Sequence, residues 1–354
     1  MNNKDKQSNP DVPKSTFLNN IFSRFVACDR SFLRLLLITV AIFVLMAILQ
    51  PDLFLTSSNF NSMSFQFPEY GILAMAIMIT MLTGGIDLSI VGIANLSAIL
   101  SALILTKFIP QGGPNESIVW IIVGAIAVSI VTGIICGFLN GLFITKIGIT
   151  PILATLGTMQ LFTGIAIVIT KGTAIYGFPE QFSNIGNGSW GFIPVPLVVF
   201  ALIVCAFVII LNKTPYGYKV YMIGTNPTAS LFSGIDNKLV LIKTYIFSGV
   251  LSSMAGLIMI ARTNSAKADY GTSYTLQAIL IAVLGGVNPN GGFGRVAGLV
   301  LAILSLQFLS SGFNMLRFSN FFKEFVWGAV LIIVMIINYY GNKRHSQKRV
   351  NAKQ

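Results

Sequence analysis

Charged residues are spaced so widely in this chain that they leave ten long charge-free stretches. They make up 10% of the sequence, whereas a soluble globular domain carries roughly 25%. A helix that crosses a bilayer needs about 20 mostly apolar residues. The sequence therefore predicts an all-α, polytopic membrane helical bundle with ten transmembrane segments. The charge-free stretches are 35–51, 70–86, 88–106, 117–145, 147–170, 181–212, 244–261, 270–294, 296–316 and 325–342.

Two of these stretches do not fit one simple helix. The segment "IGNGSWGFIPVP" (185–196) indicates a loop, which leaves a helix from about Pro196 to Leu211 in the sixth stretch. The eighth stretch begins with polar residues and ends in glycines, so only Thr275 to Leu284 looks helical. That helix is too short for a full crossing.

Lysine and arginine concentrate in cytoplasmic loops of membrane proteins. If the N-terminus is inside and ten segments cross, 17 of the 23 basic residues fall on the cytoplasmic side. We therefore expect both termini in the cytoplasm, with a basic segment at 1–33, a transmembrane domain at 34–342 and a basic tail at 343–354. Contact with anionic membrane lipid explains the net charge of +12, and no nucleic-acid partner is expected.

Signatures of soluble catalysts are missing from the sequence. No Gly-Lys pair occurs, so the chain has no Walker phosphate-binding loop. The glycines of "GGFGRVAG" (291–298) mimic a dinucleotide motif, but the next acidic residue is Glu324 and no βαβ pattern surrounds them. His345 is the sole histidine, and the three cysteines have no metal-ligand spacing. We expect no enzyme activity, cofactor or metal.

The segment "MLTGGIDLSI" (81–90) places a carboxylate and two glycines in a highly apolar region. Gly84 and Gly85 allow the chain to turn, and Ser89 can bond the freed backbone groups. Two interpretations are open for Asp87. It caps the start of the next helix, or it forms part of a gate or of a translocation path.

A second break, "LGGVNPNGGFGR" (284–295), includes Gly285 and Gly286 and falls on the same predicted cytoplasmic side. Paired interrupted segments in a membrane protein indicate a transport path, because irregular backbone at depth lines a cavity or is buried in protein. Uncharged polar residues within the spans are further candidates for the path, with interhelical hydrogen bonding as the alternative. They are Asn95, Asn140, Gln160, Thr163, Gln277, Gln307 and Asn314.

The longest predicted cytoplasmic loop is 212–243. Asn226 and Pro227 suit a helix start, and "TASLFSGI" can make two helical turns that end at Gly234. Such a short helix is suited to dock a soluble partner, and a plain connecting loop is the alternative.

Four motifs occur in an informative order: "LTGGIDLSI", "PILATLGTM" (151–159), "GTNPTASLFSGI" (224–235) and "VLGGVNPNGGFGRVAG" (283–298). With them the chain resembles the permease subunits of bacterial ABC importers for ribose, xylose, galactose and autoinducer-2. The resemblance covers roughly 35–342. "DLSIVG" and "SSGFN" (310–314) depart from the usual pattern and leave the substrate open.

The resemblance implies a multi-pass subunit of the cytoplasmic (inner) membrane that forms a sugar path as a dimer with a second permease copy. It also implies an ATP-binding cassette ATPase subunit that hydrolyses the ATP, and a periplasmic or lipid-anchored sugar-binding protein. The segment 224–235 would be the coupling helix that docks on the ATPase. Its implied coupling residues are Gly224, Asn226, Pro227, Ala229, Ser233 and Gly234.

Three other functions fit parts of the pattern. An ion-coupled secondary transporter would share the hydropathy, but most spans lack an ionisable residue near the membrane centre. A membrane-embedded enzyme would need a nucleophile, a metal or an acid–base pair. A branched-chain amino-acid permease of a related ABC class is the nearest alternative.

Overall fold

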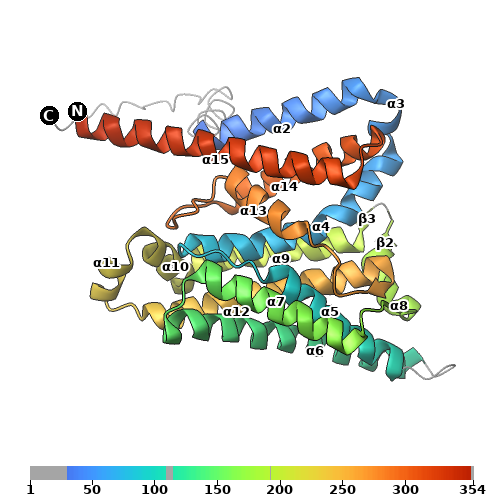
Figure 1. Ribbon diagram of the computed structural model, residues 1–354. Coiled ribbons are helices and arrows are strands. Elements are labelled where there is room, and N and C mark those ends of the chain that lie inside the picture. The colour runs from blue at the N-terminus through green and yellow to red at the C-terminus, as the bar shows by residue number, and fades with distance from the viewer. Residues whose placement is uncertain (1–29, 109–114, 192, 352–354) are drawn as a thin grey trace, which may run out of the picture.

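The computed structural model describes residues 30–108, 115–191 and 193–351. Nearly all of the regular structure in these residues is helical (Figure 1). The long helices are α2 (Arg30–Leu49), α4 (Ser57–Leu82), α5 (Ile90–Lys107), α6 (Asn115–Leu142), α7 (Pro151–Thr170), α9 (Val195–Lys213), α12 (Asn237–Thr263), α14 (Val296–Met315) and α15 (Asn320–Asn351). The short helices are α3 (Pro51–Phe54), α8 (Glu180–Asn187), α10 (Pro215–Thr225), α11 (Pro227–Phe232), α13 (Tyr274–Leu284) and the π-helical turn η1 (Phe143–Ile147).

Eight helices in the described part of the chain are long and apolar enough to cross a membrane. The prediction of a polytopic helical membrane protein is therefore confirmed. The eighth predicted segment is α13, which has 11 residues. At 1.5 Å per residue this helix is only about 17 Å long, so the predicted short helix is confirmed too.

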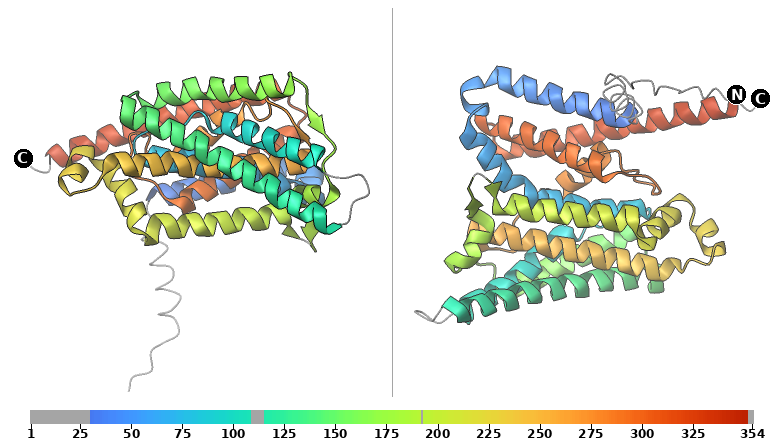
Figure 2. Two further views of the ribbon diagram at one scale, coloured as in Figure 1. Left: turned by 90° about the horizontal axis from the view of Figure 1, so that it is seen from below. Right: turned by 180° about the vertical axis from the view of Figure 1, so that it is seen from behind.

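The helices form layers that the views in Figures 1 and 2 separate clearly. α2, α14 and α15 lie on one side, α6 on the other, and α4, α9 and α12 between them. α4 is the central helix, because 89% of its apolar window is buried, compared with 17% for α2. α12 packs on α6, α4 and α5, and α14 packs on α2.

Two predicted boundaries were wrong. α4 begins at Ser57 rather than at residue 70, because Glu69 is an internal residue of the helix with a buried ion-pair partner. The predicted loop at 185–196 contains the end of α8 and a small hairpin of β2 (Ser189–Trp190) and β3 (Ile193–Pro194). The basic tail predicted at 343–354 stays a prediction, and the structure describes it as helical as far as Asn351, the end of α15. Of the predicted basic segment 1–33, residues 1–29 lie outside the described residues.

The connections after α7 and after α12 are joined at one end of the bundle. β1 (Ile175–Tyr176) pairs antiparallel with β4 (Ser265–Ala266). Asn264 Oδ1 accepts a hydrogen bond from the amide of Phe178 at 2.9 Å. Asn187 Nδ2 donates to the carbonyls of Ala261 and Arg262, each at 3.1 Å. These bonds link the end of α12 to the segment that follows α7.

Glycines let α6 and α12 approach closely. Gly133, Gly137 and Gly141 recur every four residues on α6 and face the backbone of α12. A Cβ on Gly137 would lie 2.8 Å from the Cα of Ile246 and closer still to the carbonyl of Tyr245. Small residues at such spacing let helices pack at short range in membranes.

We expect Gly137→Ala to destabilise the protein by about 1–3 kcal/mol, because the new methyl group must push two helix backbones apart. Thermal unfolding in mild detergent measures this effect. Gly124→Ala is the matched control on the same helix, since a Cβ there meets no atom within 4 Å. Equal melting temperatures for the two variants would contradict the packing argument.

Candidate functional site

The first predicted break separates α4 from α5 and consists of residues 83–89. Gly84 has a φ of +84°, a conformation that favours glycine. Its amide donates to the carbonyl of Met81 at 2.9 Å, and the amide of Gly85 donates to that of Thr80 at 3.1 Å. A Cβ on Gly85 would lie 2.5 Å from the Tyr245 hydroxyl, so this position requires a glycine for a close approach as well.

Asp87 is fully buried and joins the break to α12. Its Oδ1 accepts hydrogen bonds from the amide and the hydroxyl of Ser89, at 3.0 and 2.6 Å. Its Oδ2 accepts a bond from the Ser248 hydroxyl at 2.7 Å. Asn140 of α6 donates to Ser89 Oγ at 2.7 Å. We call Asp87, Ser89, Asn140 and Ser248 the Asp87 network.

Of the two interpretations left open for Asp87, the cap of α5 does not take the expected form. The residue at the N-cap position is Ser89, whose side chain makes no capping bond. Asp87 instead accepts from the amide of the N-cap residue and reaches across to Ser248. These bonds join the break to the start of α5 and to α12.

Thr155 of α7 holds the same break from another side. Its hydroxyl accepts from the amide of Leu88 and donates to the carbonyl of Ile86, both at 3.1 Å. Backbone groups freed from helical geometry are thereby satisfied by side chains, as a membrane interior requires.

The second predicted break separates α13 from α14 at residues 285–295. Gly286, Gly291 and Gly292 all have positive φ values, of +82°, +90° and +78°. Asn288 organises the turn: its amide donates to Phe293 O at 2.8 Å, and its Nδ2 donates to Gly291 O at 3.0 Å. Gly285 packs on the backbone of Leu299, where a Cβ would lie 2.9 Å away.

The two breaks touch each other and the start of the predicted coupling segment. Gly292 N donates to Leu82 O at 3.0 Å. A Cβ on Gly291 would lie 2.8 Å from Gly84 N and 2.9 Å from the Cα of Gly224. A Cβ on Gly224 would overlap Leu82 O and Gly292 N. We call Gly84, Gly224, Gly291 and Gly292 the glycine junction.

The predicted coupling segment forms α11. Asn226 Oδ1 accepts from the amides of Thr228 and Ala229 at 3.0 Å, so the predicted helix start at Asn226 and Pro227 is confirmed. Ser233 donates to Ala229 O at 2.9 Å. Gly234 has a φ of +78° and ends the turn, as predicted. The helix exposes 60% of Leu231 and 87% of Phe232, two residues that sequence reasoning did not select.

The polar candidates within the spans do not form one site. Asn140 belongs to the Asp87 network, near the glycine junction. Asn95 binds the carbonyls of Ala268 and Tyr270 at 2.9 Å and so supports the loop after α12. Gln160 is exposed on the surface of α7, and Thr163 is half-buried there. Gln277, Gln307 and Asn314 line cavities at the opposite end of the bundle.

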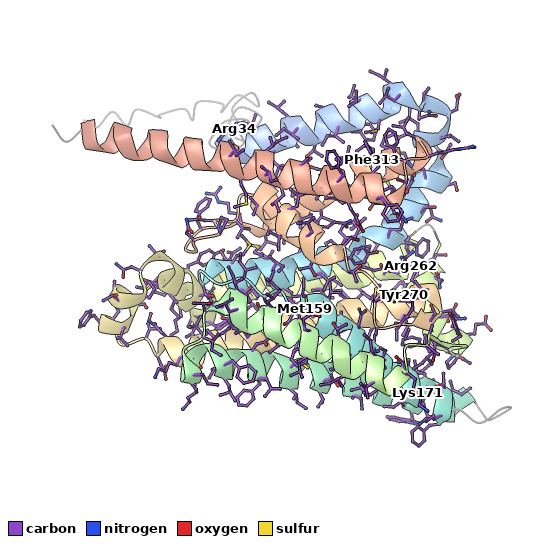
Figure 3. The ribbon with its side chains drawn as sticks, in the orientation of Figure 1. Arg34, Met159, Lys171, Arg262, Tyr270 and Phe313 are labelled. Atoms are coloured by element: carbon purple, nitrogen blue, oxygen red, sulfur yellow. The ribbon has the colours of Figure 1, made fainter. Side chains whose placement is uncertain are left out.

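The cavity that contains Gln277 and Gln307 has a volume of about 280 Å³. Arg262 lines it and forms an ion pair with Glu69, which is 1% exposed. Sequence reasoning missed Glu69 because a charge was treated as the boundary of a span. The sequence does contain an indication of this pair. Glu69 borders one charge-free stretch and Arg262 borders another, so the two opposite charges can lie at a comparable membrane depth. Figure 3 shows Arg262 at the end of the bundle opposite to α10 and α11.

Comparison with known proteins identifies the class. A family model described as "Branched-chain amino acid transport system / permease component" matches residues 59–335. The chain belongs to this permease family. It is 35% identical to the ribose import permease protein RbsC of Bacillus subtilis, over 83% of this chain and 88% of the relative. It is 31% identical to the autoinducer 2 import system permease protein LsrD of Yersinia pseudotuberculosis, over 78% of this chain and 81% of the relative.

These relatives confirm the predicted resemblance to permease subunits of ABC sugar importers. They are membrane permeases and not enzymes, which agrees with the prediction that this chain has no catalytic role. No solved structure gives a significant match to the chain.

We expect Asp87→Asn to keep most of the folded stability, because an amide oxygen can still accept the two bonds from Ser89. Asp87→Leu should destabilise the protein more strongly, since each buried group left unpaired costs about 1–3 kcal/mol. Thermal unfolding in detergent ranks the variants, and Ser248→Ala isolates the bond to α12. If the leucine and asparagine variants have the same melting temperature, Asp87 does not anchor the break.

Proposed function

We propose that this chain is the transmembrane permease subunit of an ABC importer for a monosaccharide or a related sugar-like solute. A separate ATP-binding cassette ATPase subunit supplies the energy, and a periplasmic or lipid-anchored binding protein delivers the solute. The names of the relatives, a ribose permease and an autoinducer 2 permease, support the solute class.

The observation that carries this proposal is the position of α11. This short capped helix projects Phe232 away from the bundle, with 87% of the side chain exposed. Through Gly224 the same segment touches the end of α4 at the first break and Gly292 of the second break. Tyr221 of α10 adds a hydrogen bond to the carbonyl of Gly294 at 2.8 Å. A partner that moves α11 would therefore act directly on both breaks.

The proposed arrangement places α10 and α11 in the cytoplasm of a bacterial inner membrane. The start of α2 and the end of α15 lie toward the same end of the bundle, which supports cytoplasmic termini (Figure 1). In this arrangement 1–33 is a cytoplasmic segment, 34–342 is the permease domain, and 343–354 is a cytoplasmic extension. A second permease copy, identical or different, completes the path.

The proposed mechanism couples ATP binding to the glycine junction. Closure of the ATPase dimer would draw the two α11 helices together. Because Gly224 has no side chain and lies directly on two backbone groups, its movement would displace Leu82, the last residue of α4 before the first break, and Gly292 of the second break. The helices that begin or end there, α4, α5, α13 and α14, would then reorient between inward-facing and outward-facing states.

Branched-chain amino acids are the second candidate solutes, because the description of the matching family names them. We expect proteoliposomes that hold the purified importer, the ATPase and the binding protein to take up ribose, xylose or galactose when ATP is supplied, and not leucine. Omission of ATP is the control. Leucine uptake would favour the second candidate, and uptake driven by an ion gradient without ATP would favour a secondary transporter.

We expect Phe232→Ala to weaken the retention of the ATPase subunit during purification by about tenfold, because an interface aromatic contributes 1.4 kcal/mol or more. Phe321→Ala is the matched control, since Phe321 is 84% exposed and lies at the start of α15, at the opposite end. Quantitative co-purification from the native host measures the effect. Equal retention by both variants would refute docking through α11.

A further inference from the structure

A polar cavity lies at the end of the bundle away from α11, between α4, α12, α13, α14 and α15. It is lined by Gln66, Tyr70, Arg262, Ser273, Tyr274, Gln277, Gln307, Ser310, Asn320, Lys323, Glu324 and Trp327. The cavity holds about 280 Å³, which corresponds to roughly nine waters at about 30 Å³ each. This number is comparable to the number of non-hydrogen atoms in a monosaccharide.

One buried group in this cavity lacks a partner. Gln307 is only 2% exposed, and its Nε2 makes no hydrogen bond. The Tyr70 hydroxyl donates a hydrogen bond to Oε1 at the other end of the same amide. An unpaired buried amide costs free energy, and a bound hydroxyl group would remove this cost by accepting from Nε2.

The charges around the cavity cancel. Arg262 is paired with Glu69, which also accepts a hydrogen bond from the Tyr274 hydroxyl at 3.4 Å. Lys323 and Glu324 contribute one further positive and one further negative charge. A neutral solute with several hydroxyl groups suits such a lining better than an ion does. Amide and hydroxyl side chains can both donate and accept toward it.

Aromatic rings form part of the lining. Tyr70 and Tyr274 pack edge to face, with ring centroids 6.0 Å apart. Trp327 is 2% exposed and brings a ring from α15. These rings supply apolar surface beside the polar groups that dominate the lining.

We propose that this cavity is a binding site for a neutral, polyhydroxylated solute on the extracytoplasmic side, and that Gln307 donates a hydrogen bond to one of its hydroxyl groups. The inference rests on the proposed import function, because it places a receiving site at the end opposite to the coupling helix. The site belongs to a single chain and draws on five of its helices.

Protection from a membrane-impermeant thiol reagent tests occupancy directly. Ser310→Cys places a thiol in the cavity, and Ser62→Cys places a control thiol in a neighbouring cavity. Both are made in a chain without Cys28, Cys136 and Cys205 and are assembled in the complete importer. At a transported sugar concentration about tenfold above half-saturation, labelling of Ser310→Cys should slow about tenfold, while labelling of Ser62→Cys should not change. Equal rates with and without sugar at Ser310→Cys would overturn the proposal.

Deoxygenated sugars test the hydrogen bond of Gln307. Gln307→Met should lower kcat/KM for uptake of the parent sugar about tenfold. For the analogue that lacks the contacted hydroxyl, the variant and the unaltered importer should transport equally well, a pattern that a merely structural defect does not give. Ser305→Ala is the control on the same helix, because Ser305 binds Thr39 of α2 and lies outside the cavity lining.

The outcomes separate this inference from the proposed function. ATP-driven sugar uptake without protection of Ser310→Cys, or with equal slowing of every analogue by Gln307→Met, would refute the cavity site and leave the import function standing. ATP-driven uptake of leucine with no sugar uptake would refute both.

Discussion

Backbone that leaves helical geometry inside a membrane must find its hydrogen-bond partners within the protein. In this permease the requirement is met by bringing the two breaks together, so that Gly292 N donates to the free carbonyl of Leu82. Thr155 and Asp87 satisfy three further backbone groups of the first break, which are the amides of Leu88 and Ser89 and the carbonyl of Ile86. The helix ends, the approach of Gly224 and the position of α11 all depend on this contact.

The same constraint explains why polar residues gather at two levels of the bundle. At the α11 end they hold irregular backbone in place, and among their buried atoms Asn140 Oδ1 and the Tyr245 hydroxyl have no hydrogen-bond partner. At the other end the Glu69–Arg262 pair and the amides of Gln277 and Gln307 surround free space. α4 links the levels, because it carries Glu69 and Tyr70 toward the cavity and ends at Leu82, which contacts the glycine junction.

Much of this could be predicted from the sequence, for local reasons. Charge spacing located the spans, the asparagine and proline at 226–227 located α11, and clustered glycines located both breaks. Contacts between distant segments could not be predicted. Nothing local indicates that Gly292 meets Leu82, that Asp87 reaches Ser248, or that Glu69 is paired inside a helix. In the sequence, Gln307 does not differ from other polar residues within the spans. Only the structure shows that Tyr70 bonds its Oε1 and that its Nε2 has no partner.

The pairing of β1 with β4 constrains how the permease can move. It ties the segment after α7 to the end of α12, and Asn264 and Asn187 add side-chain bonds to the same region. Two helices that are tied at one end can separate only by a hinge motion about that end. Displacement of α7 relative to α12 is therefore smallest beside the tie and grows toward Gly85, where Pro151 and Tyr245 of these two helices meet the first break.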